Sequence, residues 1–183
     1  VRATPAPPWI TSTGSTGAGG TSAAMAGIET VLIDQTQEAA DKGKAYSEGL
    51  LDKAISRKKS TEDKKAEVLG RITATIDYAA LDGCDLVVEA VFEDPSVKAE
   101  VTKKAEAVIP ADAIFATNTS TLPIGELAKA SSRPDQFIGI HFFSPVEKMM
   151  LVEIILGKNT GDVALATALD YVRAIGKTPI VVN

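Results

Sequence analysis

Short apolar runs rich in β-branched residues alternate along this chain with longer segments of helical composition. Strands that alternate with helices predict an α/β domain with a largely parallel sheet. The chain has 183 residues, enough for one domain with a sizeable core. The expected strands are residues 27–34, 72–75, 85–91, 113–116, 137–141, 151–156 and 178–182, and the expected helices are residues 37–55, 61–69, 95–108, 123–130 and 162–174.

His141 is the only histidine of the chain, and it ends the apolar run 137–141 shortly before Ser144-Pro145. In an open parallel sheet, ligands bind beyond the carboxyl ends of the strands. Glu153 interrupts the apolar run 151–156, where a buried carboxylate needs a partner. One interpretation is a catalytic base whose tautomer is fixed by a carboxylate. The other is a structural pair across two strands.

The segment from Asn118 to Thr121 follows another apolar run and offers hydroxyls and an amide at a second strand end. This favours the catalytic interpretation, although the segment alone fits a capped turn into a helix near Pro123. Glu93 lies just after the run 85–91, and Lys98 lies on the first turns of the expected helix 95–108. Both could face a ligand. They could equally be a helix-terminal charge and a surface lysine.

Asp34 closes the run 27–34, where dinucleotide-binding βαβ units place an acid on the adenosine ribose. Such an acid disfavours the extra phosphate of NADP. The alternative is that Asp34 caps the following helix. Upstream, Gly14 and Gly17 supply the last two glycines of a G-x-G-x-x-G motif, but Ser12 occupies the first place.

Residues 1–22 differ from the rest in composition, because proline is frequent up to Pro8 and Thr, Ser, Gly and Ala dominate from Thr11 to Ser22. Proline is a poor central-strand residue, so this segment alone favours a flexible linker over a strand and phosphate loop. We therefore expect two parts, an atypical N-terminal segment over 1–22 and the α/β domain over 23–183. It remains open whether residues 6–11 form the first strand.

A basic stretch that includes Arg57 and Lys58 follows the expected helix 37–55. It fits a solvated helix end, or a small basic face for the phosphate groups of a large substrate. The net charge of −5 argues against a general nucleic-acid surface. The single Cys84 rules out an intrachain disulfide framework, and with one histidine it leaves little for a transition-metal site. No stretch approaches the length of a membrane span.

Three stretches together resemble the NAD-binding domain of L-3-hydroxyacyl-CoA dehydrogenases. They are Asn118-Thr119-Ser120-Thr121, His141-Phe142-Phe143-Ser144-Pro145-Val146 and Leu151-Val152-Glu153-Ile154-Ile155. The likeness is closest to the dehydrogenase part of multifunctional fatty-acid oxidation enzymes, and it extends over about residues 24–183. It implies a Rossmann-like sheet with flanking helices, NAD as cofactor and 3-hydroxyacyl-CoA as substrate.

The resemblance also implies roles for individual residues. His141 takes the proton of the 3-hydroxyl group, Glu153 orients His141, and Ser120 hydrogen-bonds the substrate oxygen. Ser144 occupies a place near the nicotinamide where many members have asparagine. The implied cofactor site comprises Asp34, Ala90, Glu93, Lys98, Asn118, Ser120 and Ser144, with Gly14 and Gly17 of the irregular glycine segment. The implied CoA site comprises Arg57, Lys58, Lys98 and Ser120.

The chain departs from the family in its first 22 residues and in ending before the family's helical domain. That domain supplies part of the substrate cleft and most of the dimer interface, so we expect an oligomeric parent enzyme and a feeble isolated fragment. The alternatives are a dehydrogenase of 3-hydroxybutyryl-CoA and a nucleotide-binding module without turnover. The expected location is the cytoplasm of a bacterium, or the mitochondrial matrix of a eukaryote.

Overall fold

A single mixed sheet organises the computed structural model, which describes residues 9–12 and 17–183. Its strands are β1 (Trp9–Ser12), β2 (Thr30–Ile33), β3 (Ile72–Thr75), β4 (Leu86–Glu89), β5 (Ile114–Thr117), β6 (Phe137–Phe142), β7 (Leu151–Ile155) and β8 (Thr178–Val182). The helices are α1 (Gly17–Met25), α2 (Gln37–Ser56), α3 (Glu62–Gly70), α4 (Pro95–Glu106), α5 (Ile124–Leu127) and α6 (Asp162–Ala174). Short 3₁₀ turns lie at Tyr78–Leu81, Ala128–Ala130 and Pro134–Gln136.

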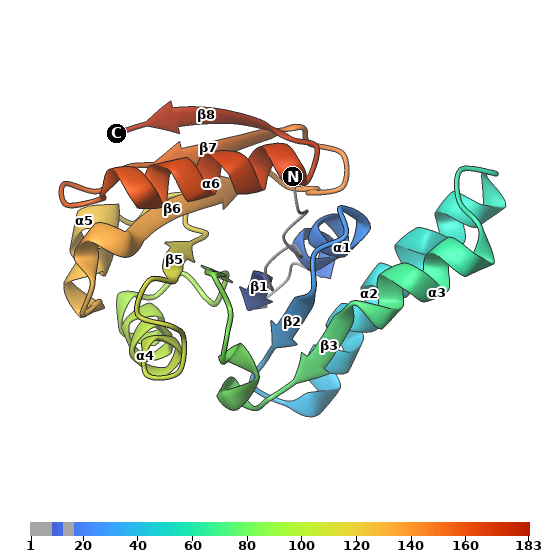
Figure 1. Cartoon of the computed structure of the whole chain (residues 1–183), viewed down its shortest axis with the longest axis horizontal. Coiled ribbons are helices and arrows are strands. Elements are labelled where there is room, and N and C mark those ends of the chain that lie inside the picture. The colour runs from blue at the N-terminus through green and yellow to red at the C-terminus, as the bar shows by residue number, and fades with distance from the viewer. Residues whose placement is uncertain (1–8, 13–16) are drawn as a thin grey trace, which may run out of the picture.

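The strand order is β3-β2-β1-β4-β5-β6-β7-β8 (Figure 1). Each pair is parallel except β6 and β7, which are antiparallel. The first six strands have the doubly wound order of dinucleotide-binding folds. The order reverses between β1 and β4, and in such sheets a ligand binds outside the carboxyl ends of the strands at that point. The α/β, Rossmann-like prediction is confirmed.

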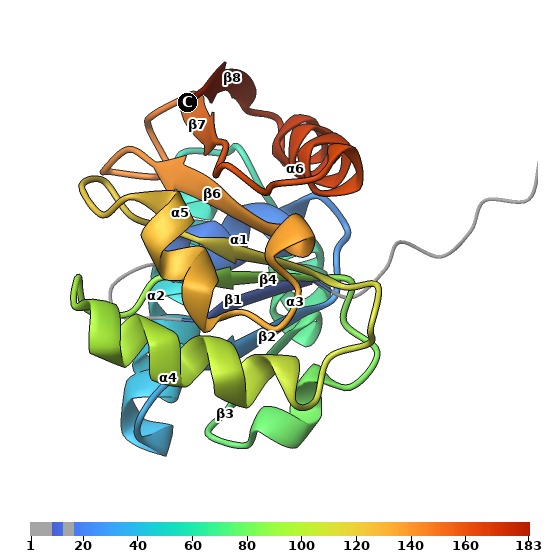
Figure 2. The ribbon, with the colours of Figure 1, turned by 90° about the vertical axis from the view of Figure 1, so that its left-hand side faces the viewer.

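Apolar side chains of the strands alternate between two helical layers. On β4 and β5, Val87 and Phe115 pack with residues of α4 and α5, whereas Leu86 and Ile114 pack with residues of α1 and α6. A third cluster joins β2 and β3 to α2 and α3. In Figure 2, α4 and α5 lie in front of the strands, and α1, α2 and α3 lie behind them. Burial on both faces explains why β4 and β5 are largely apolar.

The N-terminal segment differs from the expectation of a linker over residues 1–22. Strand β1 lies at the centre of the sheet, and Ile10 is in register with Val31 of β2 and Val87 of β4. The ladder uses backbone groups, and both prolines of the pair 7–8 precede the strand in the sequence. The boundary expected after residue 22 therefore falls inside α1.

Helix α1 forms from the small residues that suggested a linker. Its sequence GAGGTSAAM has weak helical preference because of its glycines. Burial overrides that preference, since Ala23 and Ala24 are inaccessible to solvent and the Thr21 hydroxyl donates to the Ser47 hydroxyl of α2 at 2.8 Å. Small side chains let α1 pack closely on the sheet, so tertiary contacts and not local propensity stabilise this helix.

The other predicted elements agree with the structure to within a few residues. The expected strand 85–91 is shorter, because the chain leaves the sheet after Glu89. The expected helix 123–130 splits into α5 and a 3₁₀ turn. None of the helices in residues 17–183 combines the length and the apolar composition that crossing a bilayer requires.

Candidate active site

His141 and Glu153 are direct cross-strand partners on the antiparallel pair β6–β7. Side chains of directly opposed residues stand on the same face of a sheet. His141 Nδ1 lies 2.7 Å from Glu153 Oε2, and the two side chains are 16% and 28% exposed. An ionised carboxylate can only accept, so this contact places the imidazole hydrogen on Nδ1 and leaves Nε2 with the lone pair. The contact fixes the orientation of the imidazole ring, and the His141 side chain keeps partial access to solvent.

Asn118 joins the end of β5 to the neighbouring strands. Its Oδ1 accepts from the backbone N–H of Phe142, the residue after His141, at 2.9 Å. Its own N–H donates to the carbonyl of Glu89 on β4 at 2.6 Å. The predicted turn 118–121 therefore lies beside the histidine, because β5 and β6 are parallel neighbours and their carboxyl ends lie next to each other.

Glu93 holds the rest of that turn. Its Oε1 accepts from the Thr119 hydroxyl and from the backbone N–H groups of Ser120 and Thr121, at 3.1 and 3.4 Å for the two N–H groups. Burial raises the pKa of Glu93, but the Thr119 hydrogen bond, the charge of Lys98 and the two N–H groups together outweigh it and lower the pKa. The carboxylate is thus stabilised in its charged form.

Lys98 is not the surface lysine of the alternative interpretation, because only 1% of it is exposed. Its ammonium contacts Glu89 Oε1 at 3.0 Å and Glu93 Oε2 at 3.4 Å. Glu89 is itself inaccessible to solvent. Sequence reasoning missed Glu89; the signal was a carboxylate within the buried run 85–91, the same signal that singled out Glu153.

Asp34 directly follows β2 and accepts from the N–H of Gln35 at 2.7 Å. It does not cap α2, because the N-cap is Thr36, whose hydroxyl accepts from Ala39 N–H at 3.2 Å. The capping alternative for Asp34 is therefore wrong. Ala90 follows β4 at the point where the strand order reverses. Gly17 opens α1, and Gly14 lies outside the described residues.

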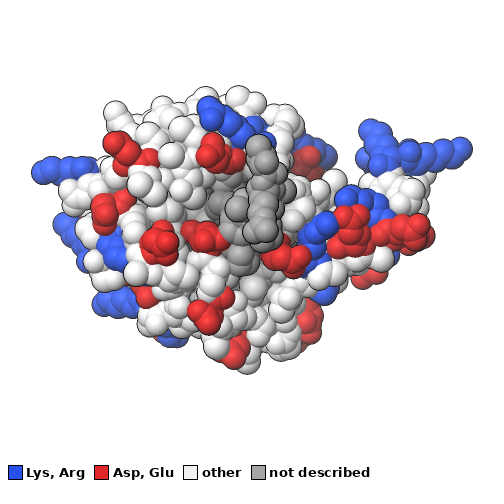
Figure 3. Space-filling view, in the orientation of Figure 1, with Lys and Arg blue, Asp and Glu red and all other residues white. Residues whose placement is uncertain are grey.

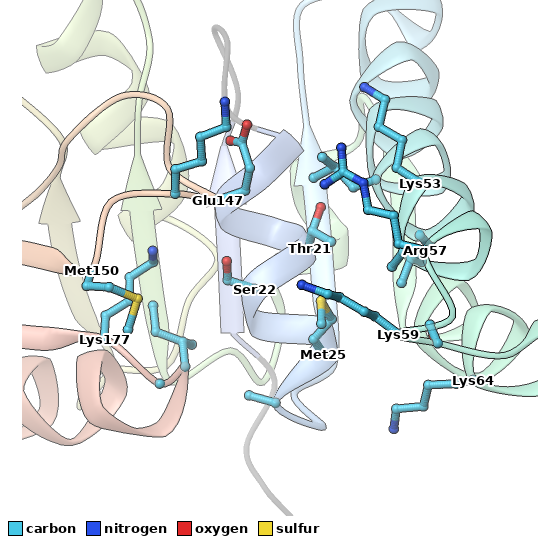
Figure 4. A pocket seen from close by; sticks show the side chains of 18 of the residues that line it. Thr21, Ser22, Met25, Lys53, Arg57, Lys59, Lys64, Glu147, Met150 and Lys177 are labelled. Atoms are coloured by element: carbon cyan, nitrogen blue, oxygen red, sulfur yellow. The ribbon is translucent and has the colours of Figure 1, made fainter.

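A cleft of about 810 Å³ lies away from the histidine, between the α2–α3 hairpin and the β6–β7 loop. Figure 4 shows Lys53, Arg57 and Lys59 on the hairpin side. On the opposite side lie Glu147, Met150 and Lys177, and α1 forms the floor with Thr21, Ser22 and Met25. Figure 3 shows Lys and Arg side chains gathered at the end of the hairpin. The predicted CoA residue Arg57 lines this cleft, whereas Lys58 does not.

The family whose description is "3-hydroxyacyl-CoA dehydrogenase, NAD binding domain" matches residues 12–183. The chain belongs to the 3-hydroxyacyl-CoA dehydrogenase family.

Solved structures of related proteins agree with this membership. A (S)-3-hydroxybutyryl-CoA dehydrogenase from Ralstonia eutropha is 37% identical, with a TM-score of 0.91 over 95% of this chain and 62% of that protein. The dehydrogenase part of multifunctional enzyme 1 from C. elegans is 32% identical, with a TM-score of 0.85 over 99% of this chain and 42% of that protein. A 3-hydroxybutyryl-CoA dehydrogenase from Escherichia coli is 29% identical, with a TM-score of 0.91 over 96% and 38%. The chain thus spans less than two thirds of each relative.

The structure of this 3-hydroxyacyl-CoA dehydrogenase domain fits the NAD that its family binds. The α1 N-terminus follows the central strand β1, and helix N-termini in this position bind pyrophosphate. Asp34 closes the second strand and is not needed as a helix cap, which suits a ribose contact. Ser144 is exposed in the loop after β6. The residues expected to hold the two ends of the cofactor thus lie at one edge of the sheet.

Sequence reasoning also missed Lys177 of this dehydrogenase domain. Its ammonium donates to the carbonyls of Val146 and Met149 in the β6–β7 loop, at 2.6 Å each. Burial lowers the pKa of Lys177, although the nearby Glu147 opposes the shift. The loop that carries Ser144 is therefore tied to the turn before β8. No local pattern marks a lysine whose partners are backbone carbonyls 28 and 31 residues earlier.

Proposed function

We propose that this domain serves the NAD-dependent oxidation of (S)-3-hydroxyacyl-CoA to 3-oxoacyl-CoA in fatty-acid β-oxidation. The observation that carries the proposal is the His141–Glu153 pair, 2.7 Å apart at the carboxyl end of β6. When bound, NAD supplies the acceptor for the hydride from C3 of the substrate. The remaining chemistry is the removal of one proton, which one correctly oriented imidazole can perform.

In this proposal, Nε2 of His141 takes the proton of the 3-hydroxyl group, and Glu153 stabilises the imidazolium that results. Ser120 donates its hydroxyl to the substrate oxygen. The backbone of Ser120 is held by Glu93, so the hydroxyl is presented from a fixed turn. Asn118 keeps the backbone after His141 in place through its hydrogen bond to Phe142.

Asp34 gives a prediction about cofactor choice. We expect the 183-residue chain to bind NADH saturably and NADPH much more weakly, because the Asp34 carboxylate accepts from the ribose and repels a 2′-phosphate. Replacing Asp34 by Ala should weaken NADH binding about 10- to 100-fold, since a hydrogen bond to a charged group contributes about 1.5–3 kcal/mol. NADH fluorescence titration measures both effects.

The matched control for Asp34 is Asp170→Ala on α6, whose carboxylate pairs with Arg173 at 3.9 Å in solvent. This variant should bind NADH as the parent chain does. Equal affinity of the Asp34→Ala and parent chains for NADH would contradict the ribose role. Absence of NADH binding by a folded parent chain would contradict the proposed function itself.

Arg57 gives a prediction about the CoA part of the substrate. The basic side of the cleft suits the phosphates of CoA, and Arg57 supplies a guanidinium group that can bind them in a bidentate manner. Because the site is exposed, we expect Arg57→Ala to weaken CoA binding by about 1 kcal/mol, or about five-fold, in a calorimetric titration. The control is Lys42→Ala on α2, the helix that ends just before Arg57; Lys42 pairs with Glu38 at 2.7 Å. Equal losses in both variants would indicate unspecific attraction and no CoA site.

A smaller substrate, 3-hydroxybutyryl-CoA, is the second candidate. It is favoured by the solved relatives from Ralstonia eutropha and Escherichia coli, both described as 3-hydroxybutyryl-CoA dehydrogenases. In an active protein that contains this domain, kcat/KM for C4 and for longer 3-hydroxyacyl thioesters separates the two candidates. A steep fall beyond C4 would assign the smaller substrate.

A further inference from the structure

Lys98 and Glu89 form a buried charge pair that the chemistry of His141 does not use directly. A lysine that is 1% exposed is uncommon and requires partners for its charge. The Lys98 ammonium donates to the Glu89 carboxylate at 3.0 and 3.3 Å and to the Val91 carbonyl at 3.4 Å, and it forms an ion pair with Glu93 Oε2 at 3.4 Å. Two carboxylates and a carbonyl inside the protein therefore surround its charge.

On one side of this pair, Glu89 connects β4 to β5. Its Oε2 accepts from the Thr117 hydroxyl of β5 at 2.7 Å, and its Oε1 accepts from the Val91 N–H at 2.6 Å. The Glu89 carbonyl accepts from Asn118 N–H. A single residue thus fixes the end of β5 and the start of the β4–α4 loop.

On the other side, Lys98 holds Glu93, whose Oε1 accepts from the backbone of Ser120. The turn that carries Ser120 is therefore fixed at both ends, through Glu89 at Asn118 and through Glu93 at Ser120. Asn118 in turn accepts from Phe142 N–H, next to His141. A continuous series of hydrogen bonds leads from Lys98 to the backbone of β6 beside the histidine.

We propose that Lys98 and Glu89 are positioning residues, whose buried ion pair fixes the turn 118–121 relative to His141. The inference deepens the proposed function and rests on it, since the turn matters because Ser120 and His141 face one substrate. In this proposal the Lys98 ammonium acts on the site through Glu89 and Glu93.

The test uses the fact that the chain has one histidine, so a single imidazole gives NMR signals that need no assignment. In Lys98→Met, we expect the His141 ring signals to shift. We expect amide exchange at Asn118, Ser120 and Phe142 to accelerate about ten-fold more than exchange at buried amides of α6, because local opening exposes only the turn. Uniform acceleration throughout the chain, or unchanged His141 signals in a folded variant, would overturn the proposal.

Lys65→Met is the matched control, because Lys65 also bridges two carboxylates, Glu48 at 3.0 Å and Asp52 at 2.6 Å, but between α3 and α2. It should leave the His141 signals and the exchange of the turn unchanged. If Lys98→Met does not fold, the double variant Lys98→Met/Glu89→Gln removes the buried unpaired charge, while the glutamine oxygen can still accept from Val91 N–H and its NH2 group can donate to the Thr117 hydroxyl. We expect the same local acceleration of amide exchange in the double variant. Exchange at the turn as slow as in the parent chain would count against the proposal.

These measurements need neither NAD nor substrate. A parent chain that fails to bind NADH would contradict the proposed function while the exchange data still report on the pair. Conversely, if the parent chain binds NADH and amide exchange at the turn is unchanged in Lys98→Met, the proposed function stands and the positioning role is excluded.

Discussion

Replacing His141 by Gln in an active protein that contains this domain should lower kcat by about 10²- to 10⁴-fold, the usual contribution of a general base. Glutamine keeps a polar side chain of similar reach but cannot take a proton at neutral pH. The effect should fall on kcat more than on KM, because the imidazole acts in the transition state and contributes little to substrate binding.

Steady-state kinetics with a 3-hydroxyacyl-CoA substrate measures this effect, and an NADH titration of the variant shows whether the cofactor site is intact. Glu153→Gln is the companion variant, since it keeps a hydrogen-bond acceptor for Nδ1 and removes the charge that stabilises the imidazolium. We expect it to lose activity as well, but less than His141→Gln. Turnover close to that of the parent in His141→Gln would exclude His141 as the base.

Replacing Gly139 by Val should lower the free energy of unfolding by about 1–3 kcal/mol, the usual cost of overpacking a core. Gly139 lies on β6, two residues before His141. A Cβ at this position would lie 2.8 Å from Ile155 Cβ on β7 and 2.8 Å from Ile124 Cδ1 on α5. The terminal methyl group of the Ile124 side chain can move aside, but the Cβ of Ile155 is fixed by the pairing of β6 with β7.

Denaturant unfolding monitored by circular dichroism measures the change. The control is Gly49→Ala on α2, where an added Cβ has no neighbour within 4 Å. Alanine should stabilise that helix by about 0.5–1 kcal/mol. If Gly139→Val were as stable as the parent chain, the close approach of β6, β7 and α5 would not be as the structure has it.

Most of the sheet could be predicted from the sequence because its strands are buried on both faces. Burial on both faces makes β4, β5 and β6 mostly apolar, and the helices between them lack proline after their first turn. The N-terminal part could not be predicted, since β1 and α1 derive their stability from neighbours. Trp9–Ser12 pairs with strands 21 and 77 residues later, and α1 is buried by α2 and the sheet. Such contacts leave no local pattern.

The residues of the candidate site could likewise be predicted only in part. A carboxylate inside an apolar run predicted Glu153 as a partner for His141, and the structure pairs them. The same rule applies to Glu89, a carboxylate within the buried run 85–91, and the structure pairs it with Lys98. Asp34 illustrates the reverse case, in which local rules allowed a helix cap and the structure assigns that cap to Thr36. Ligand contacts of Asp34, Arg57 and Ser144 stay predictions.

The pairing of β6 with β7 has a consequence for how such a site can vary between proteins. His141 meets Glu153 because the two strands are in register, not because the connection between them has a certain length. Residues 143–150 could therefore be lengthened or exchanged, and the acid would still meet the base. A shift of one residue within β7 would instead turn the carboxylate to the opposite side of the sheet. Sequence change that reshapes the mouth of the site can thus accumulate in the loop, while the proton-transfer pair is inherited with the strands.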